Sequence, residues 1–178
     1  LHAMALRPIL IHPDPRLKKR CAPVDAVDDR VRALMEDMLE TMYDAPGIGL
    51  AAPQLGVDAR VVVMDCAGKE DEPEPLRFVN PEIVWSSEET NDHEEGCLSL
   101  PEVFGMVTRP ERVRVRWLDE TGAEREAEFG GIRATCIQHE IDHLNGRLFI
   151  DYLGAARRMM ITDKMKKLKR ERAKAGAA

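Results

Sequence analysis

No run of about 18 consecutive apolar residues occurs in this 178-residue sequence, so no segment is expected to span a membrane. The four cysteines form no CxxC pair, and Pro8 and Pro13 interrupt the early apolar run that a secretory signal would need. No internal repeat is present either. Together these absences predict a cytoplasmic protein whose thiols stay reduced.

Positive charge is outnumbered by negative charge. Lys and Arg number 26 against 32 Asp and Glu, and the resulting charge of −6 argues against binding to DNA or to nucleic acids in general. The C-terminal segment is the exception, because from Arg157 onward nine basic residues stand against two acidic ones, a net +7 that leaves −13 on the first 156 residues. This segment is expected to form a basic helix over about residues 153–174, whose charged face is either solvated or in contact with ribosomal RNA.

The length and the 44% hydrophobic composition suit a single domain over residues 4–178. Leu1-His2-Ala3 before Met4 is interpreted as a cloning remnant. Apolar residues at helical spacing predict a helix within residues 27–47, and a central helix from Ile132 to Asn145 that Gly146 would terminate.

Strands are predicted at residues 60–65, 113–119 and 124–129, with one or two more between 76 and 96 that Asn80-Pro81 would interrupt. Residues 66–75 are expected to be a charged loop that adds nothing to the packing. Because strands and helices do not alternate strictly, the predicted fold class is α+β, with mostly antiparallel strands around the central helix and a C-terminal helix.

The stretch QHEIDHLNG, residues 138–146, places two histidines four positions apart in the central helix. His139 and His143 would lie one turn apart on one face and could bind one metal ion. Glu140 completes the HExxH pattern, in which the glutamate transfers protons beside the metal. The alternative explanation is a buried helix whose polar side chains satisfy one another.

A catalytic site of this kind needs a third protein ligand. Cys136 shares the face of the histidines, but it lies seven residues before His143, about 10.5 Å of helical rise, so we expect a small buried hydrophobic residue there instead. The other candidates lie in NDHEEGCLSLPE, residues 91–102, and are His93, Glu94, Glu95 and Cys97. Residue chemistry alone leaves these four open, although Gly96 would permit a close backbone approach at Cys97.

Three segments taken together, GIGLAAPQ (47–54), EGCLS (95–99) and QHEIDHLNG (138–146), resemble the signature motifs of bacterial peptide deformylases in order and rough spacing. Similarity at residues 9–24 and 148–153 extends the resemblance over most of the chain. It implies hydrolysis of the N-formyl group on the initiator methionine of nascent polypeptides, with a metal-bound water as nucleophile and formate as a product.

The same resemblance implies roles for individual residues. Cys97, His139 and His143 would hold one divalent metal ion per chain, Fe²⁺ in the cell, with Zn²⁺, Ni²⁺ or Co²⁺ able to replace it. Glu140 would be the general acid/base. Gln54 and the backbone N–H of Leu98 would stabilise the developing oxyanion, although Gln54 taken alone reads as a loop amide bonded to nearby backbone.

Substrate contacts are expected from two of the motifs. Ile48, Gly49 and Leu50 would run beside the N-formylmethionyl peptide, since main-chain hydrogen bonds accept any sequence while a pocket selects methionine. Glu95 and Gly96 are also expected at the substrate site, and His93 beside them, although a solvated acidic turn explains Glu95 and His93 equally well.

Two other functional classes fit an HExxH helix. An endopeptidase would cleave internal peptide bonds and need no formyl group. A non-catalytic metal or redox module would close its coordination shell with a fourth protein ligand.

Overall fold

The computed structural model describes residues 5–177, so the expected cloning remnant at residues 1–3 lies outside it. The described helices are α1 (Asp29–Asp44), α2 (Gly131–Leu144) and α3 (Ala155–Ala177), with short 3₁₀ helices η1 (Pro15–Lys18), η2 (Ala52–Leu55) and η3 (Phe149–Tyr152). The described strands are β1 (Gly49–Ala51), β2 (Val61–Met64), β3 (Leu76–Ser86), β4 (Thr90–Cys97), β5 (Leu100–Pro110), β6 (Arg112–Leu118) and β7 (Glu124–Gly130).

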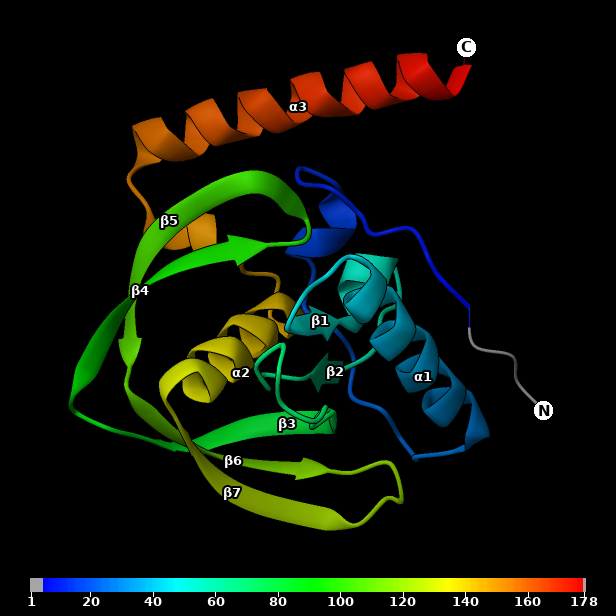
Figure 1. The fold of residues 1–178 in the computed structure, drawn as a ribbon, viewed down its shortest axis with the longest axis vertical. Coiled ribbons are helices and arrows are strands. Elements are labelled where there is room, and N and C mark those ends of the chain that lie inside the picture. Colours follow the sequence, from blue (N-terminus) through cyan, green and yellow to red (C-terminus); the bar gives the residue numbers. More distant parts are fainter. Residues whose placement is uncertain (1–4, 178) are drawn as a thin grey trace.

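All strand pairs are antiparallel. One sheet has the order β1-β2-β3-β6-β7, and β4 and β5 form a separate two-stranded sheet (Figure 1). The predicted α+β class with mostly antiparallel strands is therefore confirmed. No helix in the described part of the chain is long and apolar enough to cross a membrane.

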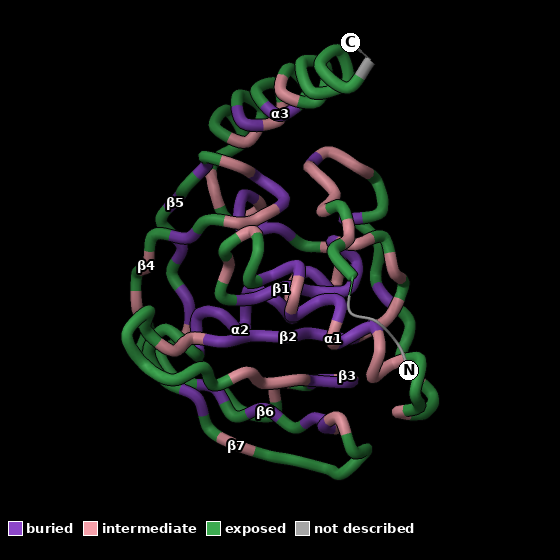
Figure 2. Tube along the Cα trace, turned by 45° about the vertical axis from the view of Figure 1, so that its right-hand side comes forward, coloured by how far each residue is buried: buried purple, intermediate pink, exposed green. Residues whose placement is uncertain are grey.

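Helix α2 lies between the two sheets and contacts strands of both (Figure 1). This helix begins and ends one residue earlier than predicted. Figure 2 shows that α2, β1 and β2 form the buried centre of the molecule. Gly146 follows the helix with φ +75°, and a Cβ there would lie 2.5 Å from the carbonyl oxygen of Lys18, so both its conformation and its contact require glycine.

The Asn80-Pro81 step distorts its strand without ending it. Residues 76–86 form one strand, β3, whose pairing with β6 shifts register between Val79 and Glu82. Asn80 has φ +50°, and its side-chain amide exchanges two 2.8 Å hydrogen bonds with the backbone of Val24. The expected interruption is thus a β-bulge, a position at which a strand tolerates proline.

Two strands fall outside the predictions. Residues 100–110 form β5. The GIGLAAPQ segment contributes β1, a short strand at the edge of the larger sheet. The expectation for residues 66–75 also needs a correction, because Cys66 at the start of this loop is half-buried and packs against the core. The rest of the loop is mostly exposed.

Helix α3 begins two residues later than expected and continues to Ala177. Only its first half joins the core, where Ile161 and Met165 pack with Leu100 and Phe149. Beyond Leu168 the helix is exposed along its described length, and Figure 2 shows it projecting from the rest of the molecule. The basic residues of the second half are therefore accessible to a partner.

Candidate metal centre and active site

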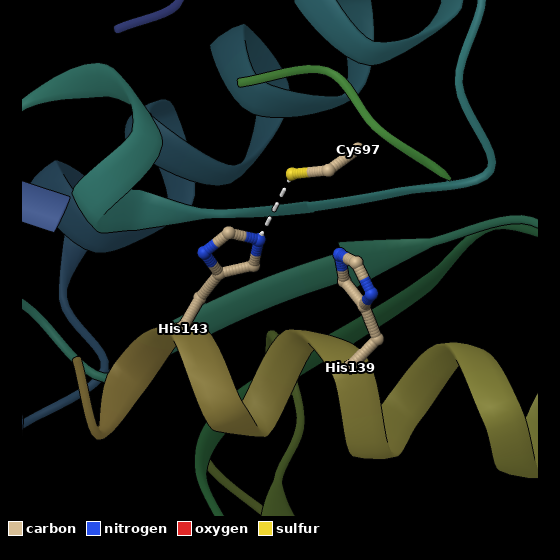
Figure 3. A group of neighbouring side chains, drawn as sticks. All are labelled: Cys97, His139 and His143. Carbon is tan, nitrogen blue, oxygen red and sulfur yellow. Dashed lines mark hydrogen bonds between the residues drawn. The ribbon is translucent and has the colours of Figure 1, made fainter. Parts of the chain in front are cut away.

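Three side chains converge from two elements. Cys97 ends β4, and His139 and His143 lie one turn apart on α2 with their rings directed toward the sulfur (Figure 3). Their potential ligand atoms all lie within 4.8 Å of one another, and Cys97 Sγ is 3.4 Å from His143 Nε2. Of the four candidates for the third ligand, the structure brings only Cys97 into this group.

The donor set fits a first-row divalent metal. Ligands at about 2.0–2.3 Å from one ion with tetrahedral angles lie about 3.6 Å apart, close to the separation of the sulfur and Nε2. Imidazole and thiolate are donors that iron, zinc, nickel and cobalt all accept. Burial lowers the pKa of His143 well below its ordinary value, which keeps this ring in the neutral form that can coordinate.

The other cysteine considered, Cys136, lies outside the group. It is 5% exposed, and its sulfur is 3.7 Å from the carbonyl oxygen of Ile48. Glu94 is exposed and also lies outside the group. The expectation that Cys136 is a small buried residue beside the site is confirmed.

Glu95 is held in a buried polar network. Its Oε1 lies 2.8 Å from His139 Nδ1, and Arg109 donates to both of its carboxylate oxygens at 2.7 and 3.0 Å. Burial raises the pKa of Glu95, but the hydrogen bonds from His139 and Arg109 outweigh this and hold the pKa below its usual value. The explanation of Glu95 as a solvated turn is therefore wrong, because only 4% of the residue is exposed.

The network continues away from the histidine. Arg109 Nη1 donates to Asp142 Oδ2 at 2.9 Å, and the Tyr152 hydroxyl donates to the same oxygen at 2.8 Å. Since Glu95 occupies His139 Nδ1, the other ring nitrogen remains for a metal, as in the carboxylate–histidine pairs that surround metal sites. Arg109 and Asp142 were not predicted as site residues from the sequence. Arg109 does lie on the same face of β5 as the buried residues Val103 and Val107, which is the signal that could have identified it.

Replacing Arg109 by leucine is expected to destabilise the fold by about 3–5 kcal/mol, because the Glu95 and Asp142 carboxylates would lose a buried partner. It should also weaken metal binding about 10- to 100-fold through the loss of order at His139. Denaturant unfolding and metal titration measure the two effects.

Arg114→Leu is the control for this prediction. Arg114 forms an exposed ion pair with Glu126, and its loss should cost no more than about 1 kcal/mol. Equal destabilisation by the two substitutions would contradict a special role for the network.

Glu140 lies next to the ligand group and is 4% exposed. Burial raises its pKa to about 7. Within the described residues its Oε2 has no hydrogen-bond partner, and its Oε1 would be 2.7 Å from a Cβ placed on Gly49. One carboxylate oxygen is thus left available for chemistry.

Gln54 is 1% exposed and bridges two of the motifs. Its Oε1 accepts from the Ala51 backbone N–H at 2.9 Å, while its Nε2 donates to Ser99 Oγ at 3.1 Å and faces Cys97 Sγ at 3.6 Å. The backbone bond expected for a loop amide is therefore present at one end. The other end directs its N–H groups at Ser99 Oγ and at the Cys97 sulfur.

A cavity of about 770 Å³ opens over these groups. Its lining includes most of the predicted site residues, namely Ile48, Gly49, Gln54, Glu95, Gly96, Cys97, Leu98, His139 and Glu140. His143 and Leu50 are the exceptions: His143 lies beneath the lining at 1% exposed, and the Leu50 side chain is fully buried in the cluster formed with α1. Any contact of Leu50 with a ligand must therefore come from its backbone in the edge strand β1.

Comparison with known proteins places this chain in a family. The family model for polypeptide deformylase matches residues 6–170. The peptide deformylase of Methylocella silvestris is 56% identical over 167 residues, which cover 92% of this chain and 85% of that protein.

Solved structures agree. A peptide deformylase from Legionella pneumophila has a TM-score of 0.87 at 47% identity, covering 95% of this chain and 98% of that one. A class I type b peptide deformylase from Acinetobacter baumannii, bound to Met-Ala-Ser, has a TM-score of 0.80 at 35% identity, covering 85% and 100%. The chain belongs to the polypeptide deformylase family.

Proposed function

We propose that this enzyme removes the N-formyl group from the initiator methionine of nascent polypeptides by metal-dependent hydrolysis. The observation that carries the proposal is the convergence of Cys97, His139 and His143 beside Glu140, at a cavity that Cys97, His139 and Glu140 line. The reaction adds water to the formyl carbon, breaks the C–N bond, and releases formate and a free amine.

The three converging side chains would hold one divalent ion, which we propose is Fe²⁺ in the cell, with Zn²⁺, Ni²⁺ or Co²⁺ as replacements. When bound, this ion would lower the pKa of a water molecule and polarise the formyl oxygen. A thiolate beside ferrous iron is open to oxidation, which is consistent with a cytoplasmic, reducing location.

Glu140 is proposed as the general acid/base. Its unpartnered Oε2 can accept the proton of the attacking water and deliver it to the amine nitrogen as the C–N bond breaks. Gln54 Nε2 and the backbone N–H of Leu98 would donate hydrogen bonds to the formyl oxygen as it becomes anionic. The Ala51 bond to Gln54 Oε1 supports this proposal, because it fixes the amide with its N–H groups toward Ser99 and Cys97.

The substrate is proposed to lie along the free edge of β1. Residues 48–50 could offer main-chain hydrogen bonds there, while the cavity beside Gly96 takes the methionine side chain. The Acinetobacter relative binds Met-Ala-Ser, a peptide that begins with the residue a deformylase exposes. Glu95 would act here through His139, the contact its carboxylate makes.

A formate-release assay tests the proposal. Purified protein loaded anaerobically with Fe²⁺ should release one formate per formyl-Met-Ala-Ser peptide and leave the peptide bonds intact. Cleavage of internal bonds in an unformylated peptide would instead indicate an endopeptidase. Failure to release formate from a metal-loaded protein would refute the function.

The accessible half of α3 is proposed to contact ribosomal RNA. Lys167, Arg170 and Lys174 are exposed. Replacing all three by glutamine should make the plot of log binding constant against log salt concentration for ribosome binding less steep, by about 2–3 in slope. Activity on a short formyl peptide should be unchanged. Sedimentation with ribosomes over a range of salt concentrations measures the slope.

The control replaces Arg112, Arg114 and Arg116, exposed residues of β6 that each pair with a glutamate, by glutamine. If the attraction to the ribosome were uniform over the surface, both triple variants would bind ribosomes equally weakly. That result would contradict a specific role for α3. Truncation after Arg158 is unsuitable, because it would remove Ile161 and Met165 from the core.

A further inference from the structure

Two thiols outside the ligand group, Cys66 and Cys136, share one hydrophobic cluster beside α2. Cys66 directly follows β2 and is half-buried, whereas Cys136 lies on α2 and is 5% exposed. Cys66 packs against the hydrophobic cluster that contains Cys136, and the two side chains interact. One thiol thus lies at the end of a central strand, and the other lies on the helix that carries His139 and Glu140.

The surroundings make the two sulfurs chemically different. Interaction with Cys136, aided by the positive charge of Arg133, lowers the pKa of Cys66 despite its partial burial. The same interaction, together with burial, raises the pKa of Cys136 well above its ordinary value. Because thiolates react with oxidants, and because Cys66 is also the more accessible of the two, Cys66 is the sulfur that an oxidant meets first. Burial raises the pKa of Cys21, which makes that thiol less reactive.

Cys136 is in turn packed against the active site. Its sulfur lies 3.7 Å from the Ile48 carbonyl oxygen and lines the cavity. A Cβ added to Gly49 would be 2.7 Å from both Cys136 Sγ and Glu140 Oε1, so these atoms share one tightly filled space. A new covalent bond at Cys136 would therefore change the packing of its sulfur against Gly49 and Glu140.

We propose that Cys66 and Cys136 form a peroxide-sensitive dithiol, which oxidises to an intramolecular disulfide and lowers the activity of the adjacent site. First, the Cys66 thiolate attacks hydrogen peroxide, the O–O bond breaks, and Cys66 becomes a sulfenic acid while the leaving hydroxide takes a proton to form water. The Cys136 sulfur then attacks the Cys66 sulfur, and a second water leaves with the thiol proton. The two thiols lose two electrons, peroxide gains them, and a dithiol reductant reverses the change.

Peptide mapping of the zinc-loaded enzyme tests this inference, since zinc itself has no redox chemistry. Trypsin would place Cys66 on residues 61–69 and Cys136 on residues 134–147, separate from the peptides of the other two cysteines. After peroxide treatment, a non-reducing map should contain these two peptides joined, and dithiothreitol should separate them. Cys66→Ser should abolish the joined species, while Cys21→Ser, which removes a thiol outside the pair, should leave it.

The effect on formate release rests on the proposed function, whereas the joined peptides do not. Formate release should fall about 10- to 100-fold on oxidation, as expected for a displacement of about 1 Å at a catalytic group, and should recover with dithiothreitol. Four free thiols after peroxide treatment, a different joined pair, or equal inactivation of Cys66→Ser would overturn the proposal. A disulfide with unchanged formate release would overturn its coupling to the site.

Discussion

Replacing Glu140 by glutamine is expected to lower kcat for formate release about 10²- to 10⁴-fold, the contribution typical of a positioned general acid/base. Glutamine keeps the shape of the side chain but cannot accept the proton of the attacking water. Metal content should not change, because Glu140 lies outside the ligand group. Thermal stability should not fall, since within the described residues Glu140 Oε2 has no hydrogen bond to lose.

The measurement is formate release under anaerobic conditions, with metal content and thermal unfolding determined on the same preparation. Glu111→Gln is the matched control, because Glu111 is exposed and lies outside the cavity lining. Its turnover should equal that of the unaltered enzyme. Turnover in Glu140→Gln within a few-fold of the control would show that another group transfers the proton.

The helical half of this site was predictable from local sequence. Spacing of four residues puts His139 and His143 on one face of any helix, and Gly146 marks where that helix must end. The helix α2 formed within one residue of its predicted bounds because apolar periodicity and terminating residues agree there. The strands predicted at residues 113–119 and 124–129 likewise formed within one residue of their bounds, and they pair as β6 and β7.

The third member of the candidate metal site could not be predicted from local sequence. His93, Glu95 and Cys97 all have the same parity in β4, so strand periodicity alone directs all three to one face. Which of them meets the histidines depends on how the small sheet lies over α2, a contact between segments more than 40 residues apart. The resemblance to a family selected Cys97, and the structure brings its sulfur to the histidines.

The buried network behind His139 was hidden for the same reason. Arg109 and Asp142 are charged residues that composition assigns to the surface, yet each is paired within the fold. Only tertiary contacts reveal that their charges compensate one another around Glu95.

Replacing Cys97 by alanine is expected to abolish detectable formate release and to weaken metal binding by at least about 10²-fold, more than the loss of an outer partner typically costs. Two imidazoles would remain, and the only thiolate in the group would be gone. Metal content after dialysis and formate release measure the two effects. Cys136→Ala is the matched control, because this thiol lies on the same helix face yet outside the ligand group, and its variant should retain the metal. Retention of metal by Cys97→Ala together with loss from Cys136→Ala would reassign the third ligand to α2, and the geometry proposed for the reaction would fail with it.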